Sequence, residues 1–375
     1  MKILFVLPAF RYGGTSTSFE NLLELIANKG FEIDVYAIVD EGSAKRRIAE
    51  HSQILNSGGN TKDGQSKRGL SFRCLAKIFK DLLSSIGLDI GTFLVRRRAR
   101  RFDCSGYDAV IGYQEGYATE FVAYSNAKKK IAWIHSMYSR WGDKKTSSIY
   151  DKINTIVCVS ETAREDMISV YPNCEDRIEV VYNSLNKDRA IALSREYISL
   201  PTSGIFRIIS VGRIDPVKRF SYIPIIANEL KQKGLKFIWT IVGGVADKKE
   251  KKALDNRIIK YGLDNTVILK GQLDNPYPEI AASNILVCLS ASETFNYTIA
   301  EAKVLGVPVI STDFPAAKEF IEDGKTGIIA PIERIAAAII SLKDDVVLYE
   351  HIRERAIEAS EGWNSIVKEQ VKSII

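Results

Sequence analysis

Short apolar runs recur along the 375-residue chain in two series, and a polar or glycine-rich turn and then a helical pattern follow most of them. The first series comprises KILFVLP, FEIDVYAIV, DAVIGY, KIAWIH, TIVCVS and IEVVYN. The second comprises FRIISVGR, KFIWTIVGG, TVILKG, NILVCLS and VPVIST. Runs of this length that alternate with helices are typical of parallel sheets covered on both faces. The pattern therefore predicts an α/β protein with two Rossmann-like domains.

The two series are separated by residues 186–204, a segment that begins polar and closes with proline and glycine. We therefore expect an N-terminal domain at 1–185, a linker at 186–204 and a C-terminal domain at 205–360. A chain of this length also exceeds what one hydrophobic core usually supports, which favours two domains.

Residues 42–101 interrupt the first series. The part at 42–70 is rich in glycine, serine, asparagine and lysine without a clear period, so we expect a mobile insertion there. A helical pattern over 72–86 follows. Between Lys62 and Arg101 the chain has eleven lysines and arginines against three aspartates, an excess larger than the +6 of the whole chain.

This basic segment ends in RRRARR at Arg96–Arg101. Such an excess predicts an anionic neighbour, either membrane headgroups or nucleic acid. No basic motif interleaved with aromatic residues supports nucleic acid, so the membrane surface is favoured. A run that is only solvated, and an insertion that is only structural, remain open alternatives.

The cysteines and the N-terminal residues indicate the cellular compartment of the protein. The five cysteines are scattered and form no C-x-x-C pair, so neither a disulfide framework nor a zinc knuckle is predicted, and a reducing compartment fits best. The apolar run in MKILFVLPAF is too brief for a signal peptide, and no run reaches transmembrane length. We expect a cytoplasmic protein, with the inner face of the membrane as an additional location.

Candidate ligand groups follow the predicted strands at one common end. In open α/β sheets, ligands bind beyond the carboxyl ends of the strands. The groups that follow strands in this way are Gly13, Gly14, Thr15, His135, Gly212, Arg213, Lys218, Gly243, Gly244 and Glu293. Each has a plain alternative: the glycines as simple turns, the cations as solvated surface residues and the histidine as a structural residue.

The stretch SASETFNYTIAEAKVLGVPVIST places Glu293 before a predicted helix and Glu301 inside it. A carboxylate in this helix can accept two hydrogen bonds from the cis-diol of a ribose, and a helix N-terminus favours phosphate. Arg213 offers a planar fork and Lys218 a point charge, a combination suited to a diphosphate. Together these groups indicate a site for a nucleotide-sugar.

These motifs resemble the retaining glycosyltransferases of family four, which have the GT-B fold. The resemblance rests on the two glutamates followed by EAKVLGVPVIST and EFIEDGKTGII, and on VGRIDPVKRF, VVYNS and KIAWIHSMY. It covers residues 1 to about 330 outside the insertion, and NPYPEIAASNILVCLSASETF is most like members that build bacterial surface polysaccharides. It implies two sheets that face each other across a cleft, and a last helix at 361–375 that returns to the first domain.

The resemblance also implies roles for particular residues. Arg213 and Lys218 would neutralise the leaving diphosphate, and Glu293 and His135 would lie beside the donor sugar; these four are the expected catalytic residues. The expected donor-binding residues are Gly13, Gly14, Gly212, Arg213, Lys218, Glu293, Phe295, Asn296, Tyr297 and Glu301. Many members have glycine where Thr294 or Asn296 stands here, which leaves the donor sugar open.

The implied reaction moves a sugar, with retention of configuration, from a UDP-sugar to a glycan or lipid-linked acceptor. The chain contains no D-x-D motif, so we expect no metal ion. We also expect no cofactor and no nucleic-acid partner. An NAD-dependent dehydrogenase is disfavoured because no G-x-G-x-x-G follows the first strand. A regulatory or scaffold subunit that binds a nucleotide-sugar without transfer remains the alternative.

Overall fold

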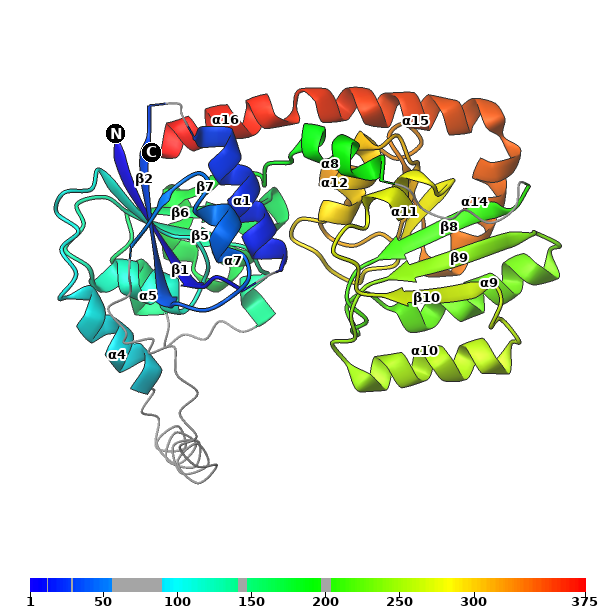
Figure 1. The fold of residues 1–375 in the computed structure, drawn as a ribbon, viewed down its shortest axis with the longest axis horizontal. Helices are drawn as coiled ribbons and strands as arrows, with labels where there is room; N and C mark the ends of the chain where they lie inside the picture. Colours follow the sequence, from blue (N-terminus) through cyan, green and yellow to red (C-terminus); the bar gives the residue numbers. More distant parts are fainter. Residues whose placement is uncertain (12, 28–29, 56–89, 141–146, 197–203) are drawn as a thin grey trace. The chain divides into compact units, whose positions relative to one another are not determined.

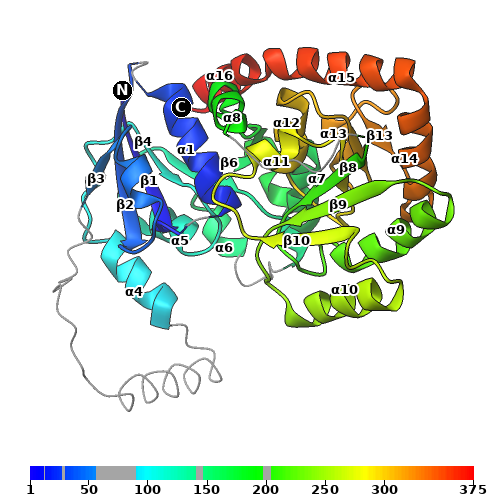
Figure 2. The ribbon, with the colours of Figure 1, turned by 45° about the vertical axis from the view of Figure 1, so that its right-hand side comes forward.

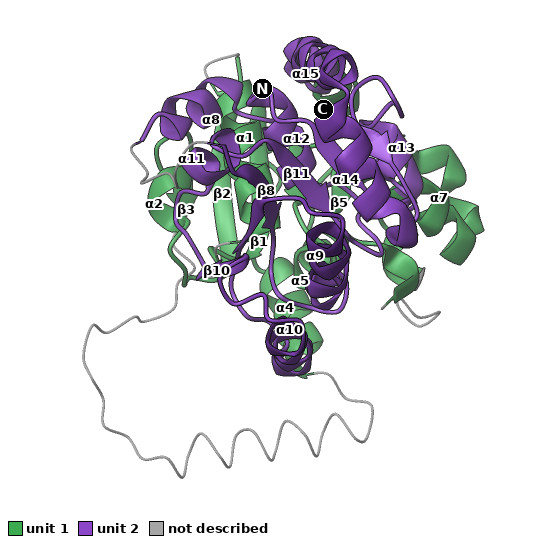
Figure 3. Ribbon diagram, turned by 90° about the vertical axis from the view of Figure 1, so that its right-hand side faces the viewer, with its two compact units in different colours: residues 1–159, 163–183, 368–375 green, residues 160–162, 184–367 purple. Residues whose placement is uncertain are grey.

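The computed structural model describes residues 1–11, 13–27, 30–55, 90–140, 147–196 and 204–375. The chain divides into two compact units, which Figure 3 shows in two colours. Unit 1 consists of residues 1–159, 163–183 and 368–375, and unit 2 of residues 160–162 and 184–367. Each unit is built on one parallel sheet, so the predicted α/β fold with two Rossmann-like domains is confirmed.

The sheet of unit 1 has the strand order β3-β2-β1-β4-β5-β6-β7. Its strands β1 and β2 are drawn in blue in Figure 1. Its strands are β1 (Lys2–Ala9), β2 (Glu32–Val39), β3 (Gln53–Leu55), β4 (Ala109–Gly112), β5 (Lys130–Ile134), β6 (Thr155–Cys158) and β7 (Ile178–Val180). The helices of this part of the chain are α1 (Gly14–Ile26), α2 (Lys45–Ile48), α4 (Ile90–Ala99), α5 (Tyr117–Tyr124), α6 (Ser147–Tyr150) and α7 (Glu161–Val170).

Both faces of this sheet are covered, which explains why its strands are almost continuously apolar. On one face Phe5 of β1 packs against Phe19 of α1, with ring centroids 5.1 Å apart. On the other face Leu4 and Phe121 of α5 belong to one buried cluster. Strands buried on both sides cannot alternate between apolar and polar residues.

The strand β3 corrects one expectation. It pairs in parallel with β2, with Tyr36 opposite Leu55, so residues 42–55 belong to the domain and the expectation of an irregular insertion is wrong for them. The apolar run around this strand consists only of Ile54 and Leu55, too short to be recognised as a strand, which is why the sequence pattern missed it. Residues 56–89, with the helical pattern at 72–86, lie outside the described residues.

The sheet of unit 2 has the order β10-β9-β8-β11-β12-β13. Its strands are β8 (Phe206–Val211), β9 (Phe237–Val242), β10 (Val267–Gly271), β11 (Ile285–Cys288), β12 (Val309–Ser311) and β13 (Ile328–Ile329). Its helices are α8 (Lys187–Ser194), α9 (Ile223–Gln232), α10 (Lys248–Lys260), α11 (Tyr277–Ala281), α12 (Tyr297–Val304), α13 (Ala317–Phe320), α14 (Ile335–Asp344) and α15 (Val346–Glu361). Helices α9 and α10 lie on one face of this sheet, and α11 and α12 on the other (Figure 2).

The segment that we expected to be a linker contains the helix α8. Asn186 caps this helix, because its Oδ1 accepts a hydrogen bond from the N–H of Arg189 at 2.8 Å. Ala190 is buried with Leu185 and Val304 of α12, so α8 is part of the packing of unit 2. Residues 197–203, the rest of the expected linker, are not described.

The last helix, α16 (Trp363–Ile374), carries residues of both units. Its residues from 368 onward belong to unit 1, where Gln370 Oε1 accepts a hydrogen bond from the N–H of Tyr182 at 3.2 Å. Lys129 Nζ donates to the carbonyl oxygen of Ile375 at 2.8 Å. Val371 is fully buried, so these residues complete the core of unit 1.

Candidate functional site

The most compact group of predicted site residues in unit 2 is an ion pair at the carboxyl edge of its sheet. Lys218 Nζ lies 2.6 Å from Glu293 Oε1, and their side chains are 18% and 15% exposed. Asp215 fixes the turn that carries the lysine, since its Oδ1 accepts the N–H groups of Val217 and Lys218, each at 3.0 Å. Burial, the largest single influence, lowers the pKa of Lys218, but Glu293, Cys288 and Asp215 together outweigh it and the pKa is raised. The lysine is therefore a fixed cation.

Two glycines let the loops beside this lysine approach each other. A Cβ on Gly212, whose φ is 153°, would lie 3.1 Å from Cε of Lys218, so the glycine makes room for the lysine stem. A Cβ on Gly243, whose φ is 149°, would lie 1.8 Å from the carbonyl oxygen of Gly212. Both positions therefore require glycine, in backbone conformation and in space.

The second predicted cation is placed differently. Arg213 is 77% exposed in its side chain, and its Nη2 lies 3.5 Å from Asp215 Oδ2. Of the two cations that the sequence predicted for a diphosphate, only Lys218 contacts a predicted acid. Arg213 remains a candidate as an exposed guanidinium in the loop that follows β8.

Glu301 lies in α12 and is 8% exposed. The hydroxyl of Tyr277, at the start of α11, donates to its Oε1 at 3.0 Å. Burial raises the pKa of Glu301 to about 7, and the hydrogen bond from Tyr277 acts in the opposite direction. This carboxyl group therefore changes its charge near neutral pH, which a surface glutamate does not do.

The side chains of the turn before α12 are held by the protein itself. Asn296 caps the helix, since its Oδ1 accepts from the N–H of Ile299 at 3.3 Å, while its Nδ2 donates to Cys288 Sγ at 3.2 Å. The ring of Phe295 packs against that of Tyr297 at 4.8 Å between centroids. A ligand over this turn would therefore meet backbone groups, as the resemblance implies.

In unit 1 a pocket of about 400 Å³ lies at the carboxyl ends of the strands. Its lining includes Gly13 and Gly14, and a Cβ built on either glycine would meet nothing within 4 Å. Packing thus does not require these glycines, and their lack of a side chain leaves the start of α1 open. The other lining residues are Leu7, Pro8, Ala9, Arg11, Thr15, Ser16, Phe19, Val39, Ile48, Gln114 and Tyr117.

His135 follows β5 and lies at the same edge of the unit 1 sheet. Its backbone N–H donates to Glu115 Oε2 at 3.0 Å, and its ring packs on Tyr113 with centroids 4.7 Å apart. Burial lowers the pKa of His135 to about 3, so its imidazole is neutral at physiological pH. A neutral imidazole can exchange hydrogen bonds with a sugar but cannot neutralise a phosphate.

Several residues at these edges were not predicted from the sequence. Gln114 and Glu115 follow β4, so the rule that ligand groups follow parallel strands was a signal that could have found them. Asp215 could also have been predicted from the sequence, because it lies shortly before Lys218 in the loop that follows β8. Tyr277 had no local signal, since its partner Glu301 lies 24 residues further along the chain.

The basic helix α4 divides its arginines between two roles. Arg96 makes two hydrogen bonds to the buried Glu120, with Nε at 2.9 Å and Nη2 at 3.0 Å, and Arg98 Nη1 donates to the carbonyl oxygen of Ile38 at 2.7 Å. The expectation that all five arginines could serve an outside partner is therefore wrong for Arg96, which holds α4 against α5. The exposed residues of this region include Phe93, Leu94, Arg97, Arg100 and Arg101.

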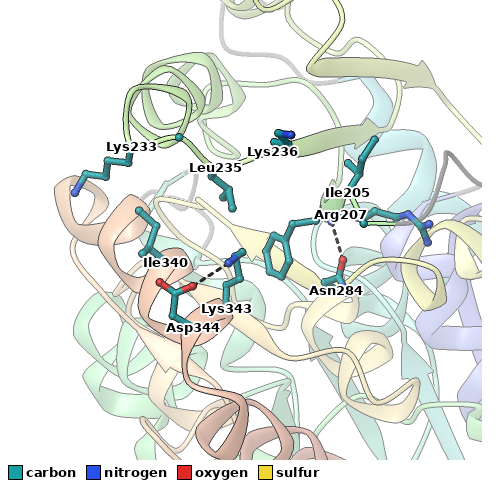
Figure 4. A pocket seen from close by; sticks show the side chains of 12 residues that line it. Ile205, Arg207, Lys233, Leu235, Lys236, Asn284, Ile340, Lys343 and Asp344 are labelled. Atoms are coloured by element: carbon teal, nitrogen blue, oxygen red, sulfur yellow. Dashed lines mark hydrogen bonds and ion pairs between the residues drawn. The ribbon is translucent and has the colours of Figure 1, made fainter.

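A larger pocket of unit 2, of about 770 Å³, lies at the opposite edge of the sheet, where β8 and β9 begin (Figure 4). Arg207 and Asn284 lie at its floor, and the backbone N–H of Arg207 donates to Asn284 Oδ1 at 2.7 Å. Lys343 and Asp344 form an ion pair at its rim (Figure 4). None of the predicted site residues lines this pocket, so it is not the candidate donor site.

Two further properties concern metals and membranes. Among the described residues, no group of three or more His, Cys, Asp or Glu is arranged to hold a metal ion. None of the helices in that part of the chain is long and apolar enough to cross a bilayer.

Comparisons with known proteins agree with this fold and these motifs. The family described as "Glycosyltransferase Family 4" matches residues 12–189, and "Glycosyl transferases group 1" matches residues 200–359. The chain is 24% identical over 333 residues, 88% of its length, to the N-acetylgalactosamine-N,N'-diacetylbacillosaminyl-diphospho-undecaprenol 4-alpha-N-acetylgalactosaminyltransferase of Campylobacter jejuni, of which the match covers 86%.

Solved structures are similar over the whole chain. The Anabaena protein HepE in complex with UDP and glucose has a TM-score of 0.73 and 16% identity, with 100% of this chain and 98% of that one covered. A mutant of S. aureus TarM in complex with Fondaparinux, alpha-GlcNAc-glycerol and UDP has a TM-score of 0.73 and 15% identity, with 100% and 99% covered. At this identity the likeness shows the fold, which is that of GT-B enzymes.

The two family matches leave out little more than the ends of the chain, and they meet at the boundary between the two series of strands. The fold and the site thus define a glycosyltransferase with two Rossmann-like domains. The chain belongs to the group 1, family-four glycosyltransferases of the GT-B fold.

Proposed function

We propose that this glycosyltransferase moves a sugar from a UDP-sugar to a glycan or lipid-linked acceptor, with retention of configuration and without a metal ion. One observation carries the proposal: a buried ammonium, Lys218, is held 2.6 Å from Glu293 in front of the helix that bears Glu301. HepE, a protein of the same fold, was crystallised with UDP and UDP-glucose, which supports UDP as the nucleotide. The relative from Campylobacter jejuni acts on a diphospho-undecaprenol acceptor by its name, which supports a lipid-linked acceptor.

In this proposal Lys218 stabilises the leaving group. The acceptor oxygen attacks the anomeric carbon from the side on which the diphosphate leaves, and the bond between that carbon and the β-phosphate oxygen breaks. Negative charge then develops on the phosphate oxygen, which takes the proton of the acceptor hydroxyl. A cation fixed before the reaction lowers this barrier without reorganising. Arg213 would add its guanidinium to the same diphosphate by a change of side-chain rotamer.

The other site residues orient the donor. Glu301 would accept hydrogen bonds from the ribose hydroxyls, and Glu293 would contact the donor sugar once the diphosphate takes its place at Lys218. The turn from Phe295 to Tyr297 would offer backbone groups, because its side chains pack within unit 2. His135 is neutral and would exchange a hydrogen bond with the sugar.

The pocket in unit 1 is the proposed place of the acceptor. Its lining combines apolar residues such as Val39 and Ile48 with the polar Arg11 and Gln114, a mixture that suits the face and the hydroxyl groups of a sugar ring. Gly13 and Gly14 line this pocket, and neither has a side chain that could obstruct a ligand.

The exposed face of α4 is the proposed contact with the inner membrane surface. Phe93 and Leu94 are 63% and 53% exposed, and Arg97 follows them on the same side of the helix at spacings of four and three residues, with the exposed Arg100 and Arg101 in the turn directly after α4. Apolar side chains that enter the headgroup region together with arginines that meet anionic lipids are a known combination for surface binding. A cytoplasmic enzyme with such a helix would work beside the lipid that carries its acceptor, as expected for surface-polysaccharide synthesis.

The test of the proposed function is a radiolabelled donor assay on the purified full chain. Many glycosyltransferases slowly hydrolyse their donor, so release of labelled sugar from one of the common UDP-sugars is the expected result. Retained UDP binding together with no release from any UDP-, GDP- or CDP-sugar would favour the scaffold alternative instead.

A further inference from the structure

Tyr277 joins two elements that both belong to unit 2. It is the first residue of α11, and its hydroxyl donates a 3.0 Å hydrogen bond to Oε1 of Glu301 in α12. Glu301 is 8% exposed and is the carboxylate that the proposed function assigns to the ribose. The tyrosine therefore directly contacts Glu301, a residue that we propose binds the ligand.

The position of this phenol is fixed from the opposite side. Asn275 Oδ1 accepts from the backbone N–H of Tyr277 at 3.1 Å, and Asn275 Nδ2 donates to the carbonyl oxygen of Leu193 in α8 at 3.0 Å. The tyrosine ring packs on the buried cluster that contains Ala190 and Val304. These contacts hold the ring in the position from which its hydroxyl meets the carboxylate of Glu301 at 3.0 Å.

We propose that Tyr277 is a positioning residue that makes the site selective for ribonucleotides, by fixing one oxygen of Glu301 so that its remaining lone pairs meet the 2′- and 3′-hydroxyls of the ribose. An ionised carboxylate has about four acceptor positions, and Tyr277 takes one of them. The remaining positions can accept two hydroxyl donors. The inference rests on the proposed function, because it assumes that a nucleoside diphosphate occupies this site.

The electrostatics give the phenol a second effect. Burial favours the neutral form of Glu301, and a protonated carboxyl group accepts fewer hydrogen bonds from a diol. The hydrogen bond from Tyr277 favours the charged form and so opposes burial. Loss of the hydroxyl should therefore weaken ribose binding most strongly at low pH.

The experiment compares UDP with 2′-deoxy-UDP by isothermal titration calorimetry at pH 6, 7 and 8, on the wild-type chain and on Tyr277→Phe. We expect the wild type to bind UDP at least about ten-fold more tightly than 2′-deoxy-UDP, because a buried acceptor is left unsatisfied by the deoxy compound. Tyr277→Phe should lose most of this ratio through weaker UDP binding, with 2′-deoxy-UDP, which keeps only the 3′-hydroxyl, weakened less. Its UDP affinity should also reach half of its maximum at a higher pH.

Two further variants keep the test specific. Tyr349→Phe removes a hydroxyl that donates to the carbonyl oxygen of Asn284 at 2.8 Å, outside the site, and should leave the ratio unchanged. In a Glu301→Gln background, Tyr277→Phe should add no further change, because the tyrosine acts through Glu301. If Tyr277→Phe does not fold, Tyr277→His retains a hydrogen-bond donor and should keep part of the ratio.

The outcomes separate the inference from the proposed function. A wild-type ratio that persists in Tyr277→Phe, or equal weakening of both ligands, overturns the role of Tyr277 and leaves the proposed function intact. A ratio that Tyr277→His loses completely overturns it as well. A wild type that binds no nucleoside diphosphate overturns the proposed function, and the inference with it.

Discussion

Lys218 Nζ and Glu293 Oε1 lie 2.6 Å apart although the residues are 75 positions apart in the chain. Each side chain neutralises the other in this ion pair, so a ligand diphosphate would compete with Glu293 for the ammonium. Since both groups are largely buried, this competition takes place where charges interact strongly.

The first prediction follows from this competition. Glu293→Gln should strengthen UDP binding several-fold, because the lysine no longer has an anionic partner in the empty site. The same variant should transfer sugar at least about ten-fold more slowly, because it loses the contact with the donor sugar. Calorimetry with UDP and initial-rate measurements with the donor separate the two effects. Glu322→Gln breaks an ion pair in which both side chains are 61% exposed, and should change neither quantity. Weaker UDP binding in Glu293→Gln would contradict the competition.

The second prediction concerns the stability of unit 2 as pH changes. The folded-state pKa of Glu301, about 7, lies above the ordinary 4.5, so the folded protein holds a proton that the unfolded chain releases between these values. The stabilisation is therefore present in full below about pH 4.5 and is lost as pH rises through 7. Glu301→Gln cannot ionise and should become more stable relative to the wild type as pH rises, by up to about 3 kcal/mol. Thermal melts of both proteins from pH 5 to 8 measure this difference, and a constant difference would contradict a raised pKa.

The third prediction tests the close approach of the loops after β8 and β9. Gly243→Ala places a Cβ 1.8 Å from the carbonyl oxygen of Gly212, so the loops must separate. We expect the free energy of unfolding to fall by about 2 kcal/mol or more, together with weaker UDP binding, because Lys218 packs on Gly212. Gly106→Ala is the matched control, since a Cβ there meets nothing within 4 Å and should leave the melting temperature almost unchanged. Equal melting temperatures for both variants would contradict the packing argument.

The fourth prediction distinguishes the arginines of α4. Replacing Arg97, Arg100 and Arg101 by Gln should reduce co-sedimentation with vesicles that contain phosphatidylserine, at about 1 kcal/mol for each charge. The double variant Arg353→Gln, Arg355→Gln, which removes two cations from α15, should bind these vesicles like the wild type. Arg96→Gln should instead lower the melting temperature, because it leaves the buried Glu120 without its two hydrogen bonds. Vesicle binding that the triple variant retains would exclude the membrane contact.

The fifth prediction concerns divalent ions. In the proposed mechanism Lys218 meets the leaving diphosphate with a fixed ammonium, so we expect sugar transfer to continue in excess EDTA at a rate within about two-fold of that with Mg²⁺ or Mn²⁺. Initial rates after dialysis against EDTA measure this directly. Loss of activity that Mn²⁺ restores would show that the diphosphate needs a metal as well as Lys218.

The sequence predicted the long strands because burial on both faces leaves a signal that needs no partner. It predicted Lys218, Glu293 and Glu301 because they follow parallel strands or share a motif. It missed β3 and β13, of three and two residues, because the apolar runs around them, Ile54-Leu55 and Ile328–Ala330, are shorter than the runs of four or more residues that mark a buried strand. It could not separate Arg96 from its neighbours either, since the distinction depends on Glu120, which only the tertiary structure places beside it.

The hydrogen bond between Tyr277 and Glu301 is another feature that the sequence could not predict. A tyrosine before a short helix has no functional pattern, and its hydroxyl gains importance only from the distance to Glu301. Arg213 shows the opposite. Its motif predicts a diphosphate-binding residue, but its side chain is 77% exposed in the structure. Motifs thus indicated the candidate residues, whereas contacts between distant segments show the surroundings of each side chain.

The placement of residues 368–375 in unit 1 has a consequence for synthesis on the ribosome. The ribosome synthesises the strands of the unit 1 sheet first. Val371 and Ile374, which are buried in unit 1, are synthesised only after all of unit 2. A nascent chain that ends before residue 368 therefore lacks these apolar side chains, and we expect it to expose the surface that they cover in the complete chain. A separately expressed fragment of residues 1–183 should remain aggregation-prone until a peptide of residues 363–375 is added in trans.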